Sequence, residues 1–288
     1  MNRLNDYKSA VEKRLFELAS VGELNRSLTE AMAYSLEAGG KRIRPVLAME
    51  FCRACGGNPY DALDAACAVE ITHTFSLIHD DLPCMDDDDL RRGKPSCHKK
   101  FGEDTALLAG DALSIKSYEV IASCNTVPQD RLLRCVAELA RAAGADGMCA
   151  GQVLDLENES REVSTERLGI THKLKTGELI SASCKIGAII AGADEEKISL
   201  ASEYGYKLGL AFQIVDDILD IEGSTEELGK PVGSDSLQNK TTYITLLGMD
   251  NAKKLAEKIT NEAMDILNNF NDCDALKELT RALLHRGK

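Results

Sequence analysis

The chain has 288 residues, of which 44% are hydrophobic and 28% charged, a composition typical of globular proteins. This composition excludes collagen-like, disordered and low-complexity chains, and the length allows one large domain or two small ones. The net charge is −13, from 34 basic and 47 acidic residues. Because nucleic acids and anionic membrane surfaces are bound by clustered Lys and Arg, we expect no nucleic-acid partner and no stable membrane anchor.

The first 18 residues are typical of an amphipathic helix and not of a signal peptide. Leu4, Tyr7, Val11, Leu15 and Leu18 recur at steps of three or four. Elsewhere, no apolar run approaches the roughly 18 residues of a transmembrane helix. We therefore expect a cytoplasmic protein whose ten cysteines are reduced and mostly buried.

The rest of the chain predicts an all-α fold of about ten or more helices in a single domain, residues 1–288. The chain has only six prolines, and long stretches between them are rich in good helix formers such as Ala, Leu, Glu and Lys. No series of alternating strands with hairpin turns occurs. In chain order, helices should break near residues 39–40, 56–59, 82–83, 93–95, 126–128 and 223–233.

One predicted helix, ending near Asp81, leads into a run of aspartates. It is apolar and uncharged from Ile71 to Ile78 apart from His73, and Pro83 should end it. Asp80 and Asp81 then lie in its last turn, where the negative end of the helix dipole disfavours them. A solvated acidic loop would explain a charge run, but it would not explain the apolar helix before it. A divalent-cation site explains both.

A second aspartate cluster lies inside a later apolar helix, over residues 209–220. Gln213, Asp216 and Asp220 are at i, i+3 and i+7 on one face, with Asp217 about 100° round the helix. Surface charge is the simpler alternative, but the flanking residues leave little polar face. Carboxylate oxygens without a Cys or His set favour Mg²⁺, which takes few protein ligands plus waters and phosphates. Two such clusters therefore predict several metal ions with a polyphosphate between them.

Cationic side chains that would complete an anion site stand beside glycine turns and next to the aspartates. Taken singly, each is more simply a solvated surface group, and His73 a core residue. The candidates are Lys41, Arg42, Arg44, Arg91, Arg92, Lys94, Lys173, Lys175, Lys230 and Lys240.

Four motifs between Gly39 and Tyr243 are specific in combination. They are Gly39-Gly40-Lys41-Arg42-x-Arg44-Pro45, Asp80-Asp81-x4-Asp86 followed by Arg91-Arg92-Gly93, Lys175-Thr176-Gly177, and Phe212-Gln213-x-x-Asp216-Asp217-x-x-Asp220 followed by Gly229-Lys230. With these motifs the chain resembles the short-chain trans-prenyl diphosphate synthases, most closely the bacterial farnesyl type. The resemblance implies helices around a deep central cavity, a homodimer, and condensation of dimethylallyl or geranyl diphosphate with isopentenyl diphosphate.

The resemblance also implies roles for single residues. As Mg²⁺ ligands it implies Asp80 and Asp86 for two ions, Asp216 with Asp220 for a third, and Asp81 and Asp217 in support, with Mn²⁺ as a possible substitute. For the allylic diphosphate it implies Arg91, Lys175 and Lys230, and for isopentenyl diphosphate Lys41, Arg44, His73 and Arg92. Thr176 and Gln213 would place polar oxygens near the carbocation. The catalytic set it implies is Asp80, Asp86, Asp216, Lys175, Thr176 and Gln213.

Product length should depend on Phe75 and Ser76. Phe75 precedes Asp80 by five residues, or ~7.5 Å along a helix, so its ring would floor the cavity below the metals. An aromatic residue there resembles the farnesyl type, although plain core packing of Phe75 is the alternative. Three other functions stay open: a synthase of ten- or twenty-carbon products, a class I terpene cyclase, and a catalytically silent subunit.

Overall fold

The computed structural model describes residues 2–19, 22–159, 161–222 and 241–284. The prediction of an all-α fold with more than ten helices is confirmed. The α-helices are α1 (Asn2–Leu18), α2 (Arg26–Leu36), α3 (Ile43–Ala54), α4 (Leu63–Asp80), α5 (Cys97–Phe101), α6 (Glu103–Ala122), α7 (Gln129–Ala143), α8 (Met148–Asn158), α9 (Thr165–His172), α10 (Glu178–Ala191), α11 (Glu195–Glu222), α14 (Tyr243–Leu247), α15 (Met249–Ile266) and α16 (Asp274–Leu284). Short turns complete them: 3₁₀ turns η1 (Pro59–Ala62) and η3 (Leu267–Asn269), and a π-helical turn η2 (Lys173–Gly177).

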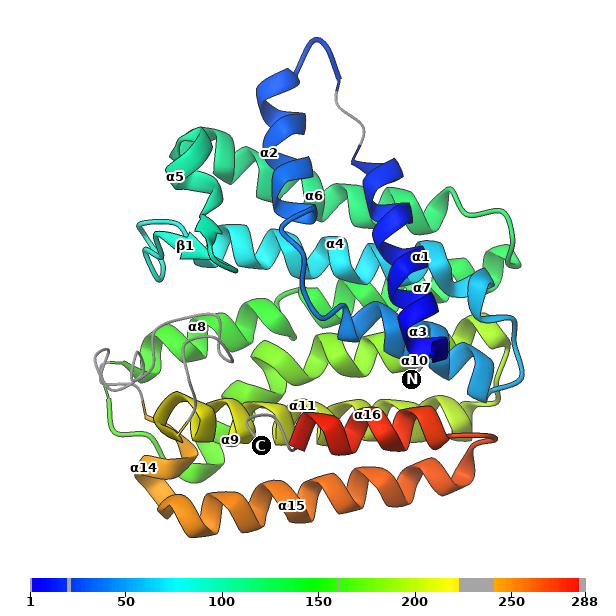
Figure 1. Ribbon diagram of the computed structural model, residues 1–288, viewed down its shortest axis with the longest axis vertical. Helices are drawn as coiled ribbons and strands as arrows, with labels where there is room; N and C mark the ends of the chain where they lie inside the picture. The colour runs from blue at the N-terminus through cyan, green and yellow to red at the C-terminus, as the bar shows by residue number, and fades with distance from the viewer. Residues whose placement is uncertain (1, 20–21, 160, 223–240, 285–288) are drawn as a thin grey trace.

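Strand structure within the described residues is limited to one small hairpin. It pairs β1 (Leu90–Arg91) with β2 (Lys94–Pro95), with Arg91 opposite Lys94. Arg92 takes a left-handed φ of 55° and Gly93 a φ of 76°, which close the turn. The hairpin follows the predicted break at 82–83 and lies beyond the C-terminal end of α4 (Figure 1).

The helices are stacked as layers, with α4, α10 and α11 following one another through the interior and α15 at the lower edge (Figure 1). A large apolar core joins the N-terminal helices to α10 and to the first half of α11. A smaller core under the second half of α11 includes residues of α9, α14 and α15. Helix α10 buries 12 of its 14 residues, since its sequence is apolar or small on all sides. Among the described residues, no helix is both long and apolar enough to cross a membrane.

Both predicted aspartate helices are present. Helix α4 ends at Asp80, with Asp81 as its capping residue, so the predicted end before Pro83 is confirmed. Helix α11 runs unbroken through the second cluster. All ten cysteines are free thiols, and six of them are buried, as expected.

A buried ion pair ties α3 to α4 at the start of the first motif. Arg42 donates to Glu70 across 2.8 Å, and both side chains are 2% exposed. The same guanidinium donates to the carbonyl of Leu36 at 2.6 Å. Arg42 has a left-handed φ of 52°, so the chain turns sharply here and α3 begins at the next residue. Arg42 therefore serves the fold.

Replacing Arg42 by Met should lower the free energy of unfolding by about 3 kcal/mol, because it leaves the Glu70 carboxylate buried without its cation. Urea unfolding followed by circular dichroism would measure the change. Arg26→Met, which removes an exposed pair with Glu30, is the matched control and should leave the unfolding midpoint unchanged. Equal midpoints for both variants would show that the buried pair contributes nothing.

Candidate active site

One large cavity, of about 1170 Å³, brings both predicted aspartate clusters together. Residues from α3, α4, α8, η2, α10 and α11 line it, with the segment before α3 and the loop after α4. Its lining includes most of the predicted site residues: Lys41, Arg44, His73, Phe75, Ser76, Asp80, Asp86, Arg91, Arg92, Lys175, Thr176, Gln213, Asp216 and Asp217. Lys230 lies outside the described residues.

The first cluster is arranged by a tight turn after α4. The backbone N–H of Asp86 donates to the carbonyl of Asp80 at 2.9 Å, and the N–H of Asp87 donates to Leu82 at 3.2 Å. The turn returns Asp86 to the side of Asp80, so that both carboxylates reach the cavity. Burial raises the pKa of Asp80 to about 6, with Lys175 opposing the rise and the negative charge of Asp86 adding to it.

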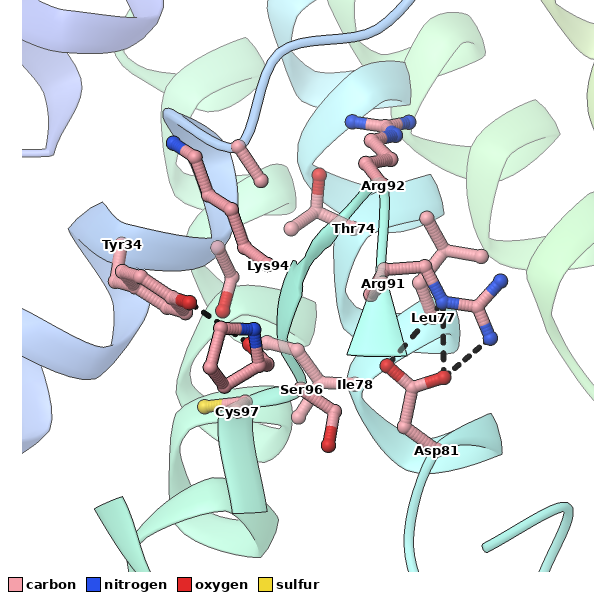
Figure 2. Close-up of a pocket in the computed structure, with 13 residues that line it drawn as sticks. Tyr34, Thr74, Leu77, Ile78, Asp81, Arg91, Arg92, Lys94, Ser96 and Cys97 are labelled. Atoms are coloured by element: carbon pink, nitrogen blue, oxygen red, sulfur yellow. Dashed lines mark hydrogen bonds and ion pairs between the residues drawn. The ribbon is translucent and has the colours of Figure 1, made fainter. Parts of the chain in front are cut away.

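Asp81 points away from this pair. Its carboxylate accepts hydrogen bonds from Arg91, from Nε at 2.9 Å and also from Nη2 (Figure 2). Arg91 also donates to Asp88 at 3.1 Å. Asp81 lines a small side pocket under the hairpin rather than the main cavity, so its place in the structure is that of a support for Arg91. Its predicted membership of the metal cluster stays a prediction.

In the second cluster, too, some carboxylates line the cavity and one does not. Asp216 and Gln213 line the cavity from one face of α11. Asp217 also lines it and accepts the backbone N–H of Tyr243 at 2.9 Å, which fixes the start of α14. Asp220 is only 2% exposed and is outside the cavity lining, one turn beyond Asp216. The structure therefore brings Gln213, Asp216 and Asp217 to the cavity and leaves Asp220 outside its lining.

Arg44, Arg92 and His73 form a cationic corner of the cavity, with Lys41 at its exposed edge. Burial lowers the pKa of Arg44 to about 10, still well above neutrality. Its Nε is buried without a hydrogen-bond partner among the described residues. Burial, followed by the charges of Arg44 and Arg92, holds the pKa of His73 well below its usual value. His73 is therefore neutral and can donate one ring N–H to an anion while two guanidinium groups supply positive charge.

Lys175 reaches the cavity from the π-helical turn η2. Burial alone would lower its pKa, but the carboxylates of Asp155 and Asp80 outweigh burial and raise it. The Lys175 ammonium donates to Asp155 at 2.6 Å. Helix α8 approaches η2 so closely that a Cβ at Gly151 would lie 2.1 Å from the Lys175 backbone nitrogen. Only glycine fits at this position, and it brings the carboxylate of Asp155 to the ammonium of Lys175.

Sequence reasoning missed α8 as a contributor to the site. Gln152 and Asp155 are at i, i+3 and both line the cavity, and the amide nitrogen of Gln152 is buried without a hydrogen-bond partner. The sequence signal was the pair Gln152 and Asp155, which follow Gly151 with the spacing of one helix face. Lys175, the partner of Asp155, is 20 residues further along the chain, so spacing alone could not pair the two side chains.

The donor set fits a hard divalent cation. The described residues include no group of three or more Asp, Glu, His or Cys side chains close enough to hold a metal by themselves. The cavity instead offers carboxylates from separate elements: Asp80 from α4, Asp86 from the loop after it, and Asp216 from α11. Mg²⁺ is suited to such a site, because it keeps several waters and binds through one or two carboxylates plus substrate phosphates.

Comparisons with known proteins agree on one family. Residues 25–283 match the model of the family described as polyprenyl synthetase. A farnesyl diphosphate synthase from Geobacillus stearothermophilus is 50% identical over 253 residues, 87% of this chain and 85% of that protein. A putative chloroplastic geranylgeranyl pyrophosphate synthase of Arabidopsis thaliana is 46% identical over 284 residues, 92% of this chain and 79% of that protein. A crystal structure of an FPP/GFPP synthase from Zymomonas mobilis superposes with a TM-score of 0.88, at 34% identity, covering 98% of each chain.

Lys175→Met should weaken the binding of inorganic pyrophosphate with Mg²⁺ by roughly tenfold or more, because one charge-assisted hydrogen bond is lost. Isothermal titration calorimetry in constant Mg²⁺ would measure this. Lys173→Met is the matched control, since its ammonium lies over the ring of Tyr206 at 4.8 Å and its side chain is exposed. Equal losses in both variants would mean that binding responds to general charge and not to Lys175.

Proposed function

The chain belongs to the polyprenyl synthetase family and is a prenyltransferase, and we propose that its product is (2E,6E)-farnesyl diphosphate. It would join dimethylallyl and then geranyl diphosphate to isopentenyl diphosphate, releasing pyrophosphate each time. The observation that carries the proposal is a single cavity lined by carboxylates of both aspartate clusters, by the cationic corner, and by Phe75.

The allylic diphosphate would lie between the two aspartate clusters. Asp80, Asp86 and Asp216 would hold three Mg²⁺ ions, or Mn²⁺ in their place, with Asp81, Asp217 and Asp220 supporting these ligands. Bound Mg²⁺ supplies positive charge to the departing diphosphate. Lys175, Arg91 and Lys230 would contact the same diphosphate directly. These cations stabilise the charge that develops on oxygen as the allylic carbon–oxygen bond breaks.

The second substrate would occupy the cationic corner. Arg44, Arg92 and Lys41 would bind the diphosphate of isopentenyl diphosphate, and neutral His73 would donate one N–H to it. Its double bond then attacks the allylic cation, forming a carbon–carbon bond, and the departing pyrophosphate accepts the proton that is lost. Thr176 and Gln213 would place oxygens near the cation, and closure of the site against water would protect the cation.

The aromatic ring of Phe75 favours a fifteen-carbon product over a longer one. Phe75 lines the cavity one and a half turns before Asp80, with the smaller Ser76 beside it. Ser76 donates to the carbonyl of His73 at 2.9 Å, and its side chain is the smaller of the two. A twenty-carbon product is the second candidate, because geranylgeranyl synthases are among the relatives. We further propose a homodimer working in the cytoplasm.

The pure protein, given Mg²⁺, dimethylallyl diphosphate and labelled isopentenyl diphosphate, should yield mainly farnesol after dephosphorylation. Asp80→Ala and Asp216→Ala should each lower the rate at least about a hundredfold, because the charge they organise acts on the transition state. Asp89→Ala, in the same aspartate run but exposed and paired with Lys99 at 2.8 Å, should keep the wild-type rate. Absence of condensation by folded protein would favour a silent subunit or a cyclase, and wild-type rates in Asp80→Ala would contradict the site.

Phe75→Ala should move the main product from fifteen to twenty carbons or more, because the truncated side chain deepens the cavity. Phe75→Tyr keeps the bulk and should keep the fifteen-carbon product. Chromatography of the dephosphorylated alcohols would size both. If Phe75→Ala still stops at fifteen carbons, Phe75 is ordinary core packing and another residue ends the chain.

A further inference from the structure

His79 lies one turn after Phe75 on α4 and directly before Asp80, and the functional proposal gives it no role. Its ring meets Phe75 edge to face, with ring centroids 5.9 Å apart and an interplanar angle of 73°. This is the geometry that aromatic pairs prefer, and it adds to the stabilisation from burial alone. Phe75 itself is only half-buried, because one side of it faces the cavity.

The far side of His79 is fixed by α6. Its Nε2 lies 3.1 Å from the carbonyl oxygen of Leu107, so Nε2 carries the proton and donates it. Opposite the ring stands Gly110, where a Cβ would lie 2.2 Å from Nε2 and 2.4 Å from Cδ2. The missing side chain of Gly110 leaves a slot on α6 that the imidazole fills, and the Leu107 carbonyl sets the ring's orientation in that slot.

We propose that His79 is a positioning residue for product length, which holds the ring of Phe75 across the cavity from its slot on α6. The inference rests on the proposed function and deepens it. Phe75 has two side-chain torsions, and packing must select one rotamer for the ring to act as a floor. The ring of His79, which lines the cavity beside Phe75 and is held on α6, supplies that packing. Product length then depends on a unit of Phe75, His79 and Gly110 and not on one aromatic side chain.

His79→Leu removes the imidazole ring and its N–H donor and puts an apolar side chain of similar size in their place. It should raise the ratio of the next longer product to the main product roughly fivefold, the fold-change that one aromatic contact of usual strength corresponds to. His79→Phe restores a ring edge and should show a clearly smaller change. Gly110→Ala fills the slot without altering a residue that lines the cavity, and should shift the ratio in the same direction as His79→Leu. Ser114→Ala, one turn further along α6, is the matched control.

The double variant Phe75→Ala with His79→Leu separates positioning from a direct effect. If His79 acts through Phe75, the double variant should give the same product ratio as Phe75→Ala alone. Melting temperatures of all variants accompany the assay, since a general loss of packing lowers stability without changing the product ratio. Gly110→Ala is the variant most at risk of misfolding, and the His79 variants decide the question without it.

The outcomes distinguish this inference from the function beneath it. Wild-type protein that forms no condensation product overturns the proposed function. Wild-type protein that condenses, together with a folded His79→Leu variant of unchanged product ratio, overturns the inference alone. So does a His79→Leu effect of equal size with and without Phe75, because His79 would then act independently of that ring.

Discussion

The structure depends on keeping several negative charges close together inside a largely buried cavity. Burial and the negative charge of Asp86 raise the cost of ionising Asp80, as the raised pKa of Asp80 records. Lys175 opposes this effect from the π-helical turn η2. A site that attracts cations must keep its negative charge. A fold that buries this charge must offset the electrostatic cost with nearby positive side chains. The cavity meets both needs by placing fixed positive side chains around its carboxylates and leaving the remaining charge for bound ions.

A second layer of ion pairs holds those positive side chains in place. Asp81 accepts hydrogen bonds from Arg91, and Asp155 accepts one from Lys175. Each support is a carboxylate that accepts a hydrogen bond from one of these cations. Arg42 with Glu70 does the same for the backbone that carries Arg44. Removing one partner from such a pair leaves the other charge buried and unpaired, so these supports hold geometry more strongly than their net stabilisation suggests.

The sequence was enough to predict that the two aspartate helices would share a site. Carboxylates on an otherwise apolar helix are unfavourable unless they bind cations, and both helices carry such carboxylates. It also predicted the helix end at Asp80 and the cationic partners around the glycine turns. It did not predict which way Asp81 would face, since neighbouring residues at a helix end look alike until the following hairpin is placed. Asp155 was missed for a related reason: its partner Lys175 is brought to it by the packing of α8 on η2, which leaves no periodic signal.

The π-helical turn η2 has a consequence for how the length of this protein can change. Helices α9 and α10 continue on either side of η2 without a break, so the three form one rod with a single widened turn. A π turn holds one more residue than an α turn in nearly the same rotation, so deleting one residue between Lys173 and Gly177 would let the rod relax to regular α-helix with its two halves nearly in phase. The buried faces of α10 would keep their neighbours, whereas the side chains within the turn, Lys175 among them, would change position. A one-residue deletion here would therefore alter the cavity more than the packing of the helices, although no loop, strand or proline marks the position.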